Sequence, residues 1–398
     1  MTARAPRIFL VATEPSGDLL GAAPAAAIRA RAPQAQFAGV GGEAMAGEGI
    51  ASVFDIADLS VLGLFEGFKI WALVNRRAQE TAEAVRDFDA DAVVLIDSWG
   101  FSIRAAKRIR AEAPATRIIK YVGPQVFATR PGRAKVLALS VDRLLAIHPF
   151  DAPYYEPHGL PVSFVGNPAL ERRVSGDGAA VRRRQRIGPD EPLLLVLFGS
   201  RTAEVKRLAP RFAAALSRLR VVYPQLRYAT VVSSTVAGVV REAIAAHPSL
   251  QTMTVVEGAE RRDAFSAADM ALACSGTVTL ELARAGVPTI AAYRLGWASW
   301  AVARAILMRA KYISLVNLAA DEALIPEFVQ TRCTGDRLAD AVAAFMEDPK
   351  GCAALSERLI EVTAQMKGPG KPPSEAAAEA VLGTLGEARL AAPGRSTA

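Results

Sequence analysis

The 398-residue sequence contains only three cysteines and three histidines. Cys274, Cys333 and Cys352 lie far apart and form no CxxC pair, which argues against a disulfide framework or a zinc site and fits the reducing cytoplasm. No run approaches the roughly 20 apolar residues of a membrane-spanning helix. Glu14 and Asp18 interrupt the first apolar run before a secretory signal could form. We therefore expect a cytoplasmic protein whose contact with a membrane is peripheral.

Aromatic residues are also few, at 7% of the chain, although hydrophobic residues make up 51%. This balance favours helices packed on parallel strands over an all-β sandwich. The length exceeds what one core usually organises, so two domains are expected. A formal net charge of +7 indicates a polyanionic partner: nucleic acid, an anionic bilayer or a phosphorylated substrate. No nucleic-acid-binding module is recognisable, and we expect no nucleic-acid partner.

Short apolar runs alternate with amphipathic stretches, which is typical of βαβ units and parallel sheets. The predicted fold is α/β, with a first domain over 1–168 and a second over 169–350, separated by a polar, Arg-rich segment. Helices follow at 351–385, and 386–398 is predicted to be a disordered tail. The apolar runs are 8–12, 92–97, 117–124 and 143–147 in the first series, and 193–199, 228–234, 252–258, 270–276 and 289–294 in the second.

Two strand-to-helix loops of the second series suit phosphate binding. GSR at 199–201 and SGT at 275–277 each lead into a helix start, where free backbone N–H groups and the helix dipole favour an anion. Arg201 can add a charged, two-pronged hydrogen bond. Either loop alone is equally well an ordinary turn, but together they predict a diphosphate ligand. Glu281 lies one helical turn after Thr277, where it either accepts from ribose hydroxyls or complements the helix dipole.

Carboxylates at strand ends are the candidate catalytic groups of the first series. Asp97 closes the apolar strand AVVLID, where apolar neighbours would suit a general base, and a helix N-cap is the competing interpretation. Glu14 ends the first strand and can orient a sugar hydroxyl. Ser16, Gly17 and Asp18 follow as a capped, tight turn at the same edge of the sheet.

A stretch at 61–77 that is rich in apolar residues places large apolar side chains on one helical face. Buried core is the usual meaning of such a face. We favour a helix lying in a membrane interface, because basic residues accompany the aromatic ones, and four basic residues of a later helix can attract anionic lipid. The apolar residues are Leu64, Phe65, Phe68 and Trp71, and the basic residues are Arg104, Lys107, Arg108 and Arg110.

The sequence resembles lipid-A-disaccharide synthases from its first strand to about residue 385. The motifs that carry the resemblance are EPSGD, GVGG, VLGLFEGF, LID, GNP, LFGSR followed by AEV, SGTVTLELA, YISLVNL and PEFVQ. The resemblance implies two Rossmann-like domains facing across a cleft, with the C-terminal helix returning to the first. It implies an inverting transfer of 2,3-diacylglucosamine from its UDP derivative to 2,3-diacylglucosamine 1-phosphate, which forms a β-1,6 disaccharide and releases UDP. It implies no cofactor and no metal.

The resemblance also implies roles for individual residues. Asp97 is the expected catalytic carboxylate, with Glu14 as the second candidate, while Asn167 and the turn at 16–18 line the acceptor side of the cleft. The expected location is the cytoplasmic face of the bacterial inner membrane, on anionic lipid, and a homodimer is left open. The expected donor-binding residues are Ser200, Arg201, Ser275, Gly276, Thr277, Glu281, Tyr293, Asn317, Glu327 and Gln330.

Some positions depart from the usual family pattern, which leaves the acyl length and the sugar open. They are Pro15, Trp99, Gly100 and Phe127. Two other functions stay open on the sequence. A UDP-sugar epimerase of the same architecture would leave the greasy helix unexplained, and a non-catalytic lipid-binding protein is suggested by the changed residues near Asp97.

Overall fold

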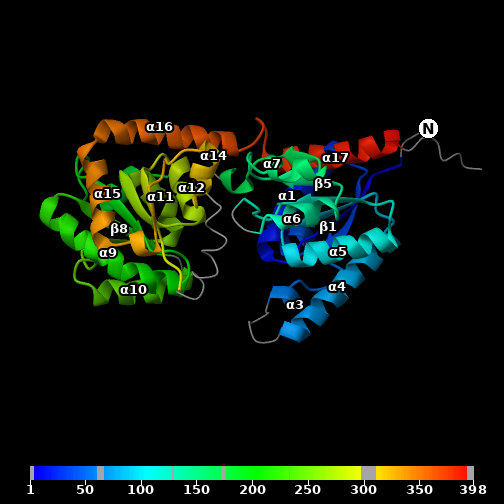
Figure 1. Ribbon diagram of the computed structural model, residues 1–398, viewed down its shortest axis with the longest axis horizontal. Helices are drawn as coiled ribbons and strands as arrows, with labels where there is room; N and C mark the ends of the chain where they lie inside the picture. The colour runs from blue at the N-terminus through cyan, green and yellow to red at the C-terminus, as the bar shows by residue number, and fades with distance from the viewer. Residues whose placement is uncertain are drawn as a thin grey trace, which may run out of the picture. The chain divides into compact units, whose positions relative to one another are not determined.

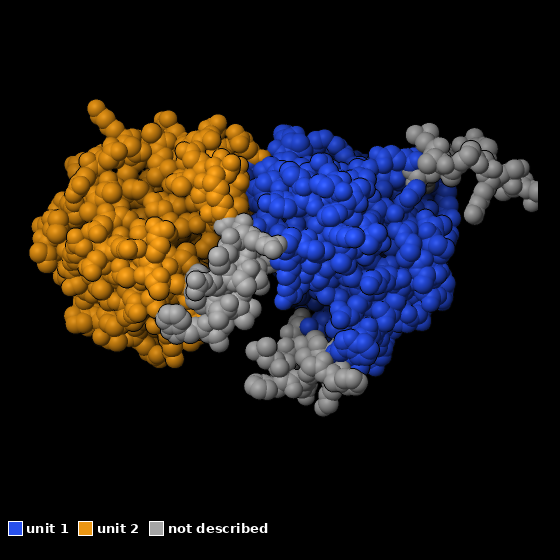
Figure 2. All heavy atoms as spheres, viewed as in Figure 1, with its two compact units in different colours: residues 1–171, 366–398 blue, residues 172–365 orange. Residues whose placement is uncertain are grey.

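A computed structural model describes residues 4–60, 67–127, 130–171, 176–232, 234–296 and 311–391. The chain forms two compact units (Figure 2). Unit 1 consists of Met1–Glu171 and Met366–Ala398, and unit 2 consists of Arg172–Gln365. Each unit contains one six-stranded, all-parallel sheet. The prediction of an α/β fold with two Rossmann-like domains is confirmed.

The sheet of unit 1 has the order β2-β1-β3-β4-β5-β6. Its strands are β1 (Arg7–Val11), β2 (Gln36–Val40), β3 (Ala92–Ile96), β4 (Arg117–Tyr121), β5 (Arg143–Ala146) and β6 (Val162–Phe164). Its helices are α1 (Pro15–Arg31), α2 (Glu43–Gly47), α3 (Ala57–Ser60), α4 (Gly67–Asp87), α5 (Trp99–Glu112), α6 (Gly132–Ala138), α7 (Ala152–Tyr155) and α17 (Pro373–Ala391). Every residue of β3 is buried, because helices cover both faces of a parallel sheet.

The sheet of unit 2 has the order β12-β11-β10-β7-β8-β9, which is the strand order of a doubly wound dinucleotide-binding fold. Its strands are β7 (Leu193–Leu197), β8 (Arg227–Val232), β9 (Thr254–Glu257), β10 (Met270–Cys274), β11 (Thr289–Tyr293) and β12 (Glu327–Val329). Its helices are α8 (Gly178–Arg184), α9 (Thr202–Val222), α10 (Ala237–Ala246), α11 (Arg261–Ala267), α12 (Thr277–Arg284), α14 (Leu315–Ala320), α15 (Gly335–Glu347) and α16 (Pro349–Met366).

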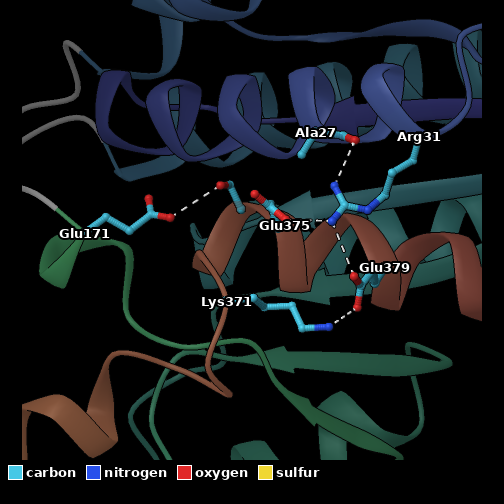
Figure 3. A network of polar contacts seen from close by, with 7 residues as sticks. Ala27, Arg31, Glu171, Lys371, Glu375 and Glu379 are labelled. Carbon is cyan, nitrogen blue, oxygen red and sulfur yellow. Dashed lines mark hydrogen bonds and ion pairs between the residues drawn. The ribbon is translucent and has the colours of Figure 1, made fainter.

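The C-terminal helix α17 packs beside α1 within unit 1 (Figure 1). Its apolar face joins the core through Ala377, Val381 and Leu385. Polar contacts border this face (Figure 3): Arg31 Nη2 lies 2.7 Å from Glu375 Oε2 and 3.3 Å from Glu379 Oε1. These ion pairs are partly exposed and contribute little, so the buried apolar face is the main attachment.

Two details differ from the predicted boundaries. The helix α16 belongs to unit 2, where Leu359 and Val362 are buried and the Ser356 hydroxyl donates to the carbonyl of Gly286. The return to unit 1 therefore begins at Met366 and not at residue 351. The helix α17 extends to Ala391, into the segment predicted to be a disordered tail, where Glu387 forms an ion pair with Arg143 of β5 at 2.6 Å.

Candidate active site

Ligands of doubly wound sheets bind outside the carboxyl ends of the strands, at the point where the strand order reverses. In unit 2 this point lies between β7 and β10, which pair in parallel with Ala273 opposite Leu197. The loop after β7 is 199–201 and the loop after β10 is 275–277. The fold therefore brings the two predicted phosphate loops side by side at the switch point.

The loop before α9 is already capped by the protein. Glu204, in the first turn, accepts hydrogen bonds from the backbone N–H groups of Ser200 (3.0 Å) and Arg201 (3.2 Å). Gly199 has a φ of 103°, and a Cβ there would lie 2.4 Å from Glu204 Oε2, so glycine is required. The two N–H groups are not free, contrary to the prediction. The loop offers an anion the guanidinium of Arg201 instead, whose side chain is 80% exposed although its Nη1 lies 3.4 Å from Glu204 Oε1.

The loop before α12 has the opposite character. Its N-cap residue Gly276 makes no side-chain cap hydrogen bond, and Gly276 and Thr277 are both exposed. Two hydrogen bonds hold the loop in place: Ser275 N donates to the Ala292 carbonyl of β11 at 2.9 Å, and the Thr279 hydroxyl of α12 donates to the Gly276 carbonyl at 2.7 Å. The positive end of the α12 dipole is thus open to an anion.

Tyr293 ends β11 near both loops. It is half-buried, and burial raises the pKa of its phenol, with Cys274 and Glu204 acting in the same direction and Arg201 in the opposite one. Burial also raises the pKa of the Cys274 thiol to about 12, so this cysteine stays protonated and is no nucleophile.

Glu281 forms an ion pair within unit 2. Its Oε2 lies 2.6 Å from Nη2 of Arg261, at the start of α11, and both side chains are about two-fifths exposed, at 39% and 40%. A ribose hydroxyl would have to share the carboxylate with this arginine. The ion pair shows that Glu281 is neither a lone surface residue nor an open acceptor.

Three other predicted donor-binding residues bind the backbone of unit 2. Asn317 is buried and pairs with Ile325, donating to its carbonyl and accepting from its N–H, each at 2.8 Å. Glu327 accepts from Ser314 N at 2.6 Å and from Asn317 Nδ2 at 3.1 Å. The Gln330 Oε1 accepts from Leu295 N at 2.7 Å. These side chains therefore hold the loops around β11 and β12 in place.

In unit 1 the switch point lies between β1 and β3, which pair with Val11 opposite Leu95. Glu14 and Asp97 follow these two strands, and both are exposed. The apolar surroundings expected for Asp97 are therefore absent, because this exposed residue lies beyond the end of β3. The competing interpretation as a cap is also wrong, since Ser98 is the N-cap residue of α5. Sequence reasoning correctly brought the two carboxylates to one edge of the sheet.

The turn that carries Asp97 has an unusual backbone. Asp97 (φ 46°) and Ser98 (φ 39°) both lie in the left-handed region, at a cost of about 1–3 kcal/mol for each residue. The N–H of Asp97 donates to the Tyr121 carbonyl at 2.9 Å, and its carbonyl accepts from the Ser102 hydroxyl at 2.7 Å. The carbonyl also accepts from the ammonium of Lys120, a fully buried residue of β4. Sequence reasoning missed Lys120, although a charged residue in the central run RIIKY was a signal.

Two residues assigned to the acceptor side are engaged with backbone. Asp18 is 4% exposed and accepts from Gly42 N (2.7 Å), Ala44 N (2.8 Å) and Met45 N (3.1 Å). Asn167 accepts from Ala169 N at 3.0 Å and caps the short 3₁₀ turn Pro168–Leu170. Asp18 therefore caps α2 from a distance and joins the EPSGD and GVGG motifs. Both side chains are therefore engaged in holding the backbone and are not free to bind the acceptor sugar.

The rest of the turn at 16–18 divides between surface and core. Ser16 is exposed and lies at the same sheet edge as Glu14. Gly17 is buried, and a Cβ there would be in van der Waals contact with Ala12 (3.5 Å) and Ile96 (3.7 Å). Only Ser16 of this turn stays accessible to a substrate.

The predicted membrane helix is described only from Gly67 onward. Leu64, Phe65 and the side chain of Phe68 lie outside the described residues. Trp71 is 54% exposed on α4, whereas Ala78, Ala82 and Val85 further along the helix are buried. No helix in the described ranges is long and apolar enough to cross a membrane.

The basic residues of α5 are less available than expected. Arg110 Nη2 lies 2.8 Å from Asp142 Oδ2, and Arg108 donates to Asn75 Oδ1 at 3.0 Å. Arg104 donates to the Gly100 carbonyl at 2.7 Å. Of the four, Lys107 is the one classed as exposed. Because an ion pair with Asp142 already neutralises Arg110, the predicted attraction of this helix to anionic lipid is weaker than four free charges would give.

Phe127, one of the positions that depart from the family pattern, belongs to an aromatic cluster after the end of β5. Phe127 packs edge-on against His148 (5.9 Å between ring centroids) and Phe150 (4.9 Å), while the His148 and Phe150 rings are stacked. Burial lowers the pKa of His148 to about 4 and raises the pKa of Asp151 to about 7. His148 is therefore neutral near pH 7, whereas Asp151 gains and loses its proton in that pH range. The guanidinium of Arg133 lies over the ring of Trp99 at 4.9 Å.

The two parallel sheets and their switch points define a class: proteins built from two Rossmann-like domains. A glycosyltransferase from Rickettsia africae ESF-5 shares this fold with a TM-score of 0.61 at 12% identity, over 97% of this chain and 99% of that one. The UDP-GlcNAc 2-epimerase of Neisseria meningitidis, solved with UDP-GlcNAc bound, has a TM-score of 0.57 at 11% identity, over 96% of this chain and 100% of that one.

The chain belongs to the lipid-A-disaccharide synthase family. The family model described as lipid-A-disaccharide synthetase matches residues 8–370. The lipid-A-disaccharide synthase of Rhodospirillum centenum is 42% identical over 396 residues, covering 98% of each chain, and that of Ruegeria pomeroyi is 40% identical over 389 residues, covering 95% of each. The resemblance and the expectation of an enzyme are confirmed, and the epimerase and the non-catalytic binder are not favoured.

Proposed function

We propose that this protein transfers 2,3-diacylglucosamine from its UDP derivative to 2,3-diacylglucosamine 1-phosphate, which yields a β-1,6-linked disaccharide 1-phosphate and UDP. The observation that carries the proposal is the identity of 42% with a lipid-A-disaccharide synthase over 98% of both chains. Unit 2 binds the donor and unit 1 binds the acceptor.

The donor diphosphate binds at the start of α12. This helix start has no side-chain cap, whereas Glu204 already occupies the N–H groups before α9. A second anionic group at α9 would have to displace a carboxylate, so the two loops have different roles. The α12 loop accepts the diphosphate with its backbone, and Arg201 supplies the positive charge. As the bond to the sugar breaks, both stabilise the charge that develops on the leaving UDP.

Asp97 is the general base in this proposal. It takes the proton of the acceptor 6-hydroxyl, whose oxygen attacks C1 of the donor sugar from the face opposite UDP. The bond between C1 and the diphosphate oxygen breaks, its electron pair leaves with UDP, and the configuration at C1 is inverted. General-base catalysis of this kind contributes about 10² to 10⁴ in rate. Glu14 and Ser16, exposed at the same edge of the sheet, orient the acceptor sugar.

The protein acts at the cytoplasmic face of the inner membrane in this proposal, because both substrates carry acyl chains. Support comes from the exposed Trp71 on α4, since an amphipathic helix with an exposed aromatic residue binds at a bilayer surface. The net charge of +7 favours anionic lipid.

The test is a transfer assay in detergent micelles with the UDP-linked donor and the 1-phosphate acceptor. We expect UDP release that depends on the acceptor, together with a β-linked disaccharide identified by NMR. Asp97→Asn should lower kcat by about 10² to 10⁴, whereas Asp87→Asn, a control on the exposed end of α4, should leave kcat unchanged. Wild-type protein that releases no UDP, or releases it equally without acceptor, would contradict the proposal.

A further inference from the structure

Lys120 is a fully buried lysine in the middle of unit 1, on β4, which pairs with the strand β3 that Asp97 follows. The neighbouring positions of β4 are filled by Ile118 and Ile119, as a core strand requires. Burying an ammonium is unfavourable unless its protons are hydrogen-bonded. A lysine in this strand therefore needs a reason beyond filling space.

The contacts of Lys120 converge on the Asp97 turn. Its Nζ donates to the Asp97 carbonyl and lies 3.2 Å from the Leu95 carbonyl, 3.1 Å from the Ser102 hydroxyl and 3.5 Å from the Tyr121 carbonyl. The proton of the Ser102 hydroxyl is directed to the Asp97 carbonyl. All four partners thus act as acceptors, and an ammonium, which has three donors and no lone pair, can donate to three of them at a time.

The Asp97 peptide is the point where these contacts combine. Its carbonyl receives one donor from β4 and one from α5, and its N–H is fixed to β4. Asp97 and Ser98 both have positive φ angles, which a loop keeps only when its surroundings hold it there. Burial lowers the pKa of Lys120 to about 7, and the charge of Asp97 acts in the opposite direction. The lysine and the aspartate therefore influence each other electrostatically as well as through the peptide.

We propose that Lys120 is a positioning residue for the transfer reaction: its ammonium fixes the left-handed turn at Asp97 and thereby directs the Asp97 carboxylate at the acceptor hydroxyl. The inference rests on the proposed function, in which Asp97 is the base. It adds to that function a residue that orients the base without contacting the substrate.

The test is a double-mutant cycle of Lys120→Met with Asp97→Asn in the transfer assay. Lys120→Met should lower kcat by about 100-fold, the effect of a misplaced catalytic group, and should leave the KM for the donor within about two-fold of its wild-type value. In the Asp97→Asn background it should cause no further loss, because residues that act through one another are not additive. Ile118→Ala, on the same strand, is the control: it should lower the melting temperature without this effect on kcat.

Ser102→Ala is the second variant and decides the matter if Lys120→Met does not fold. It removes the other donor to the Asp97 carbonyl and should lower kcat by about 10-fold in the wild-type background and not in the Asp97→Asn background. The inference is overturned if either variant keeps full kcat, or loses the same factor with and without Asp97. It is also overturned if Asp97→Asn is fully active. Wild-type protein that makes no disaccharide defeats the proposed function, whereas active wild-type with unaffected variants defeats this inference alone.

Discussion

Replacing Asp18 with alanine tests whether this carboxylate holds the fold or binds the acceptor. The side chain is 4% exposed and accepts three backbone hydrogen bonds, from Gly42, Ala44 and Met45. Its removal leaves three N–H groups without an acceptor where water has little access. Since an unmet buried donor costs about 1–3 kcal/mol and these groups are only partly enclosed, we expect Asp18→Ala to lower the free energy of unfolding of unit 1 by about 3–5 kcal/mol.

Urea unfolding followed by circular dichroism measures this loss. The two units can unfold separately, so the transition of unit 1 should move to lower urea while that of unit 2 stays in place. Asp18→Asn should fall in between, because the amide keeps one acceptor oxygen and turns an NH₂ group toward a backbone donor. Glu14→Ala, an exposed neighbour, is the control and should change stability by less than about 0.5 kcal/mol. A stable Asp18→Ala protein with a raised KM for the acceptor would refute the structural role.

Three further predictions concern pH, the α9 loop and the membrane. Because the pKa of Asp151 is raised from 3.8 to about 7, its stabilising contribution is complete below pH 3.8 and is lost as the pH rises through 7. Asp151→Asn should therefore raise the free energy of unfolding at pH 8 by up to about 4 kcal/mol and change it little at pH 4, as urea unfolding at both pH values will show; an equal effect at both would contradict the assignment. Gly199→Ala should destabilise unit 2 by more than about 1 kcal/mol, because the residue has a positive φ and the new Cβ meets Glu204; calorimetry showing an unchanged melting temperature would oppose this. Trp71→Ser should reduce co-sedimentation with phosphatidylglycerol vesicles, since an inserted aromatic side chain contributes about 1.5–3 kcal/mol, and unchanged binding would exclude Trp71 from the contact.

The sequence predicted the two sheets because buried parallel strands consist of continuous apolar runs, such as LLLVL in β7. The apolar runs did not include the edge strands β2, β6 and β12. The strand β2 begins with exposed and half-buried residues, and β12 is three residues long and nowhere fully buried. Edge strands of this kind need little apolar surface, so their composition resembles that of a loop.

Carboxylates near the site show the second limit of sequence reasoning. Asp18, Glu204 and Glu327 bind backbone N–H groups of loops that come close only after folding. Asp97 is exposed and Glu281 is paired with Arg261, and no local pattern distinguishes these two carboxylates from the first three. The motifs placed Asp97 at the end of a strand and Asp18 at the start of a helix, as the structure has them, but whether a carboxylate is exposed or engaged depends on contacts made after folding.

A crystal structure of the protein with UDP tests the central claim most directly. We predict phosphate oxygens about 2.7–3.2 Å from the backbone nitrogens of Gly276 and Thr277, the Arg201 guanidinium on the same diphosphate, and Glu204 still bound to the N–H groups before α9. Phosphates that replace Glu204 at Ser200 and Arg201, or a UDP molecule bound away from α12, would contradict the account.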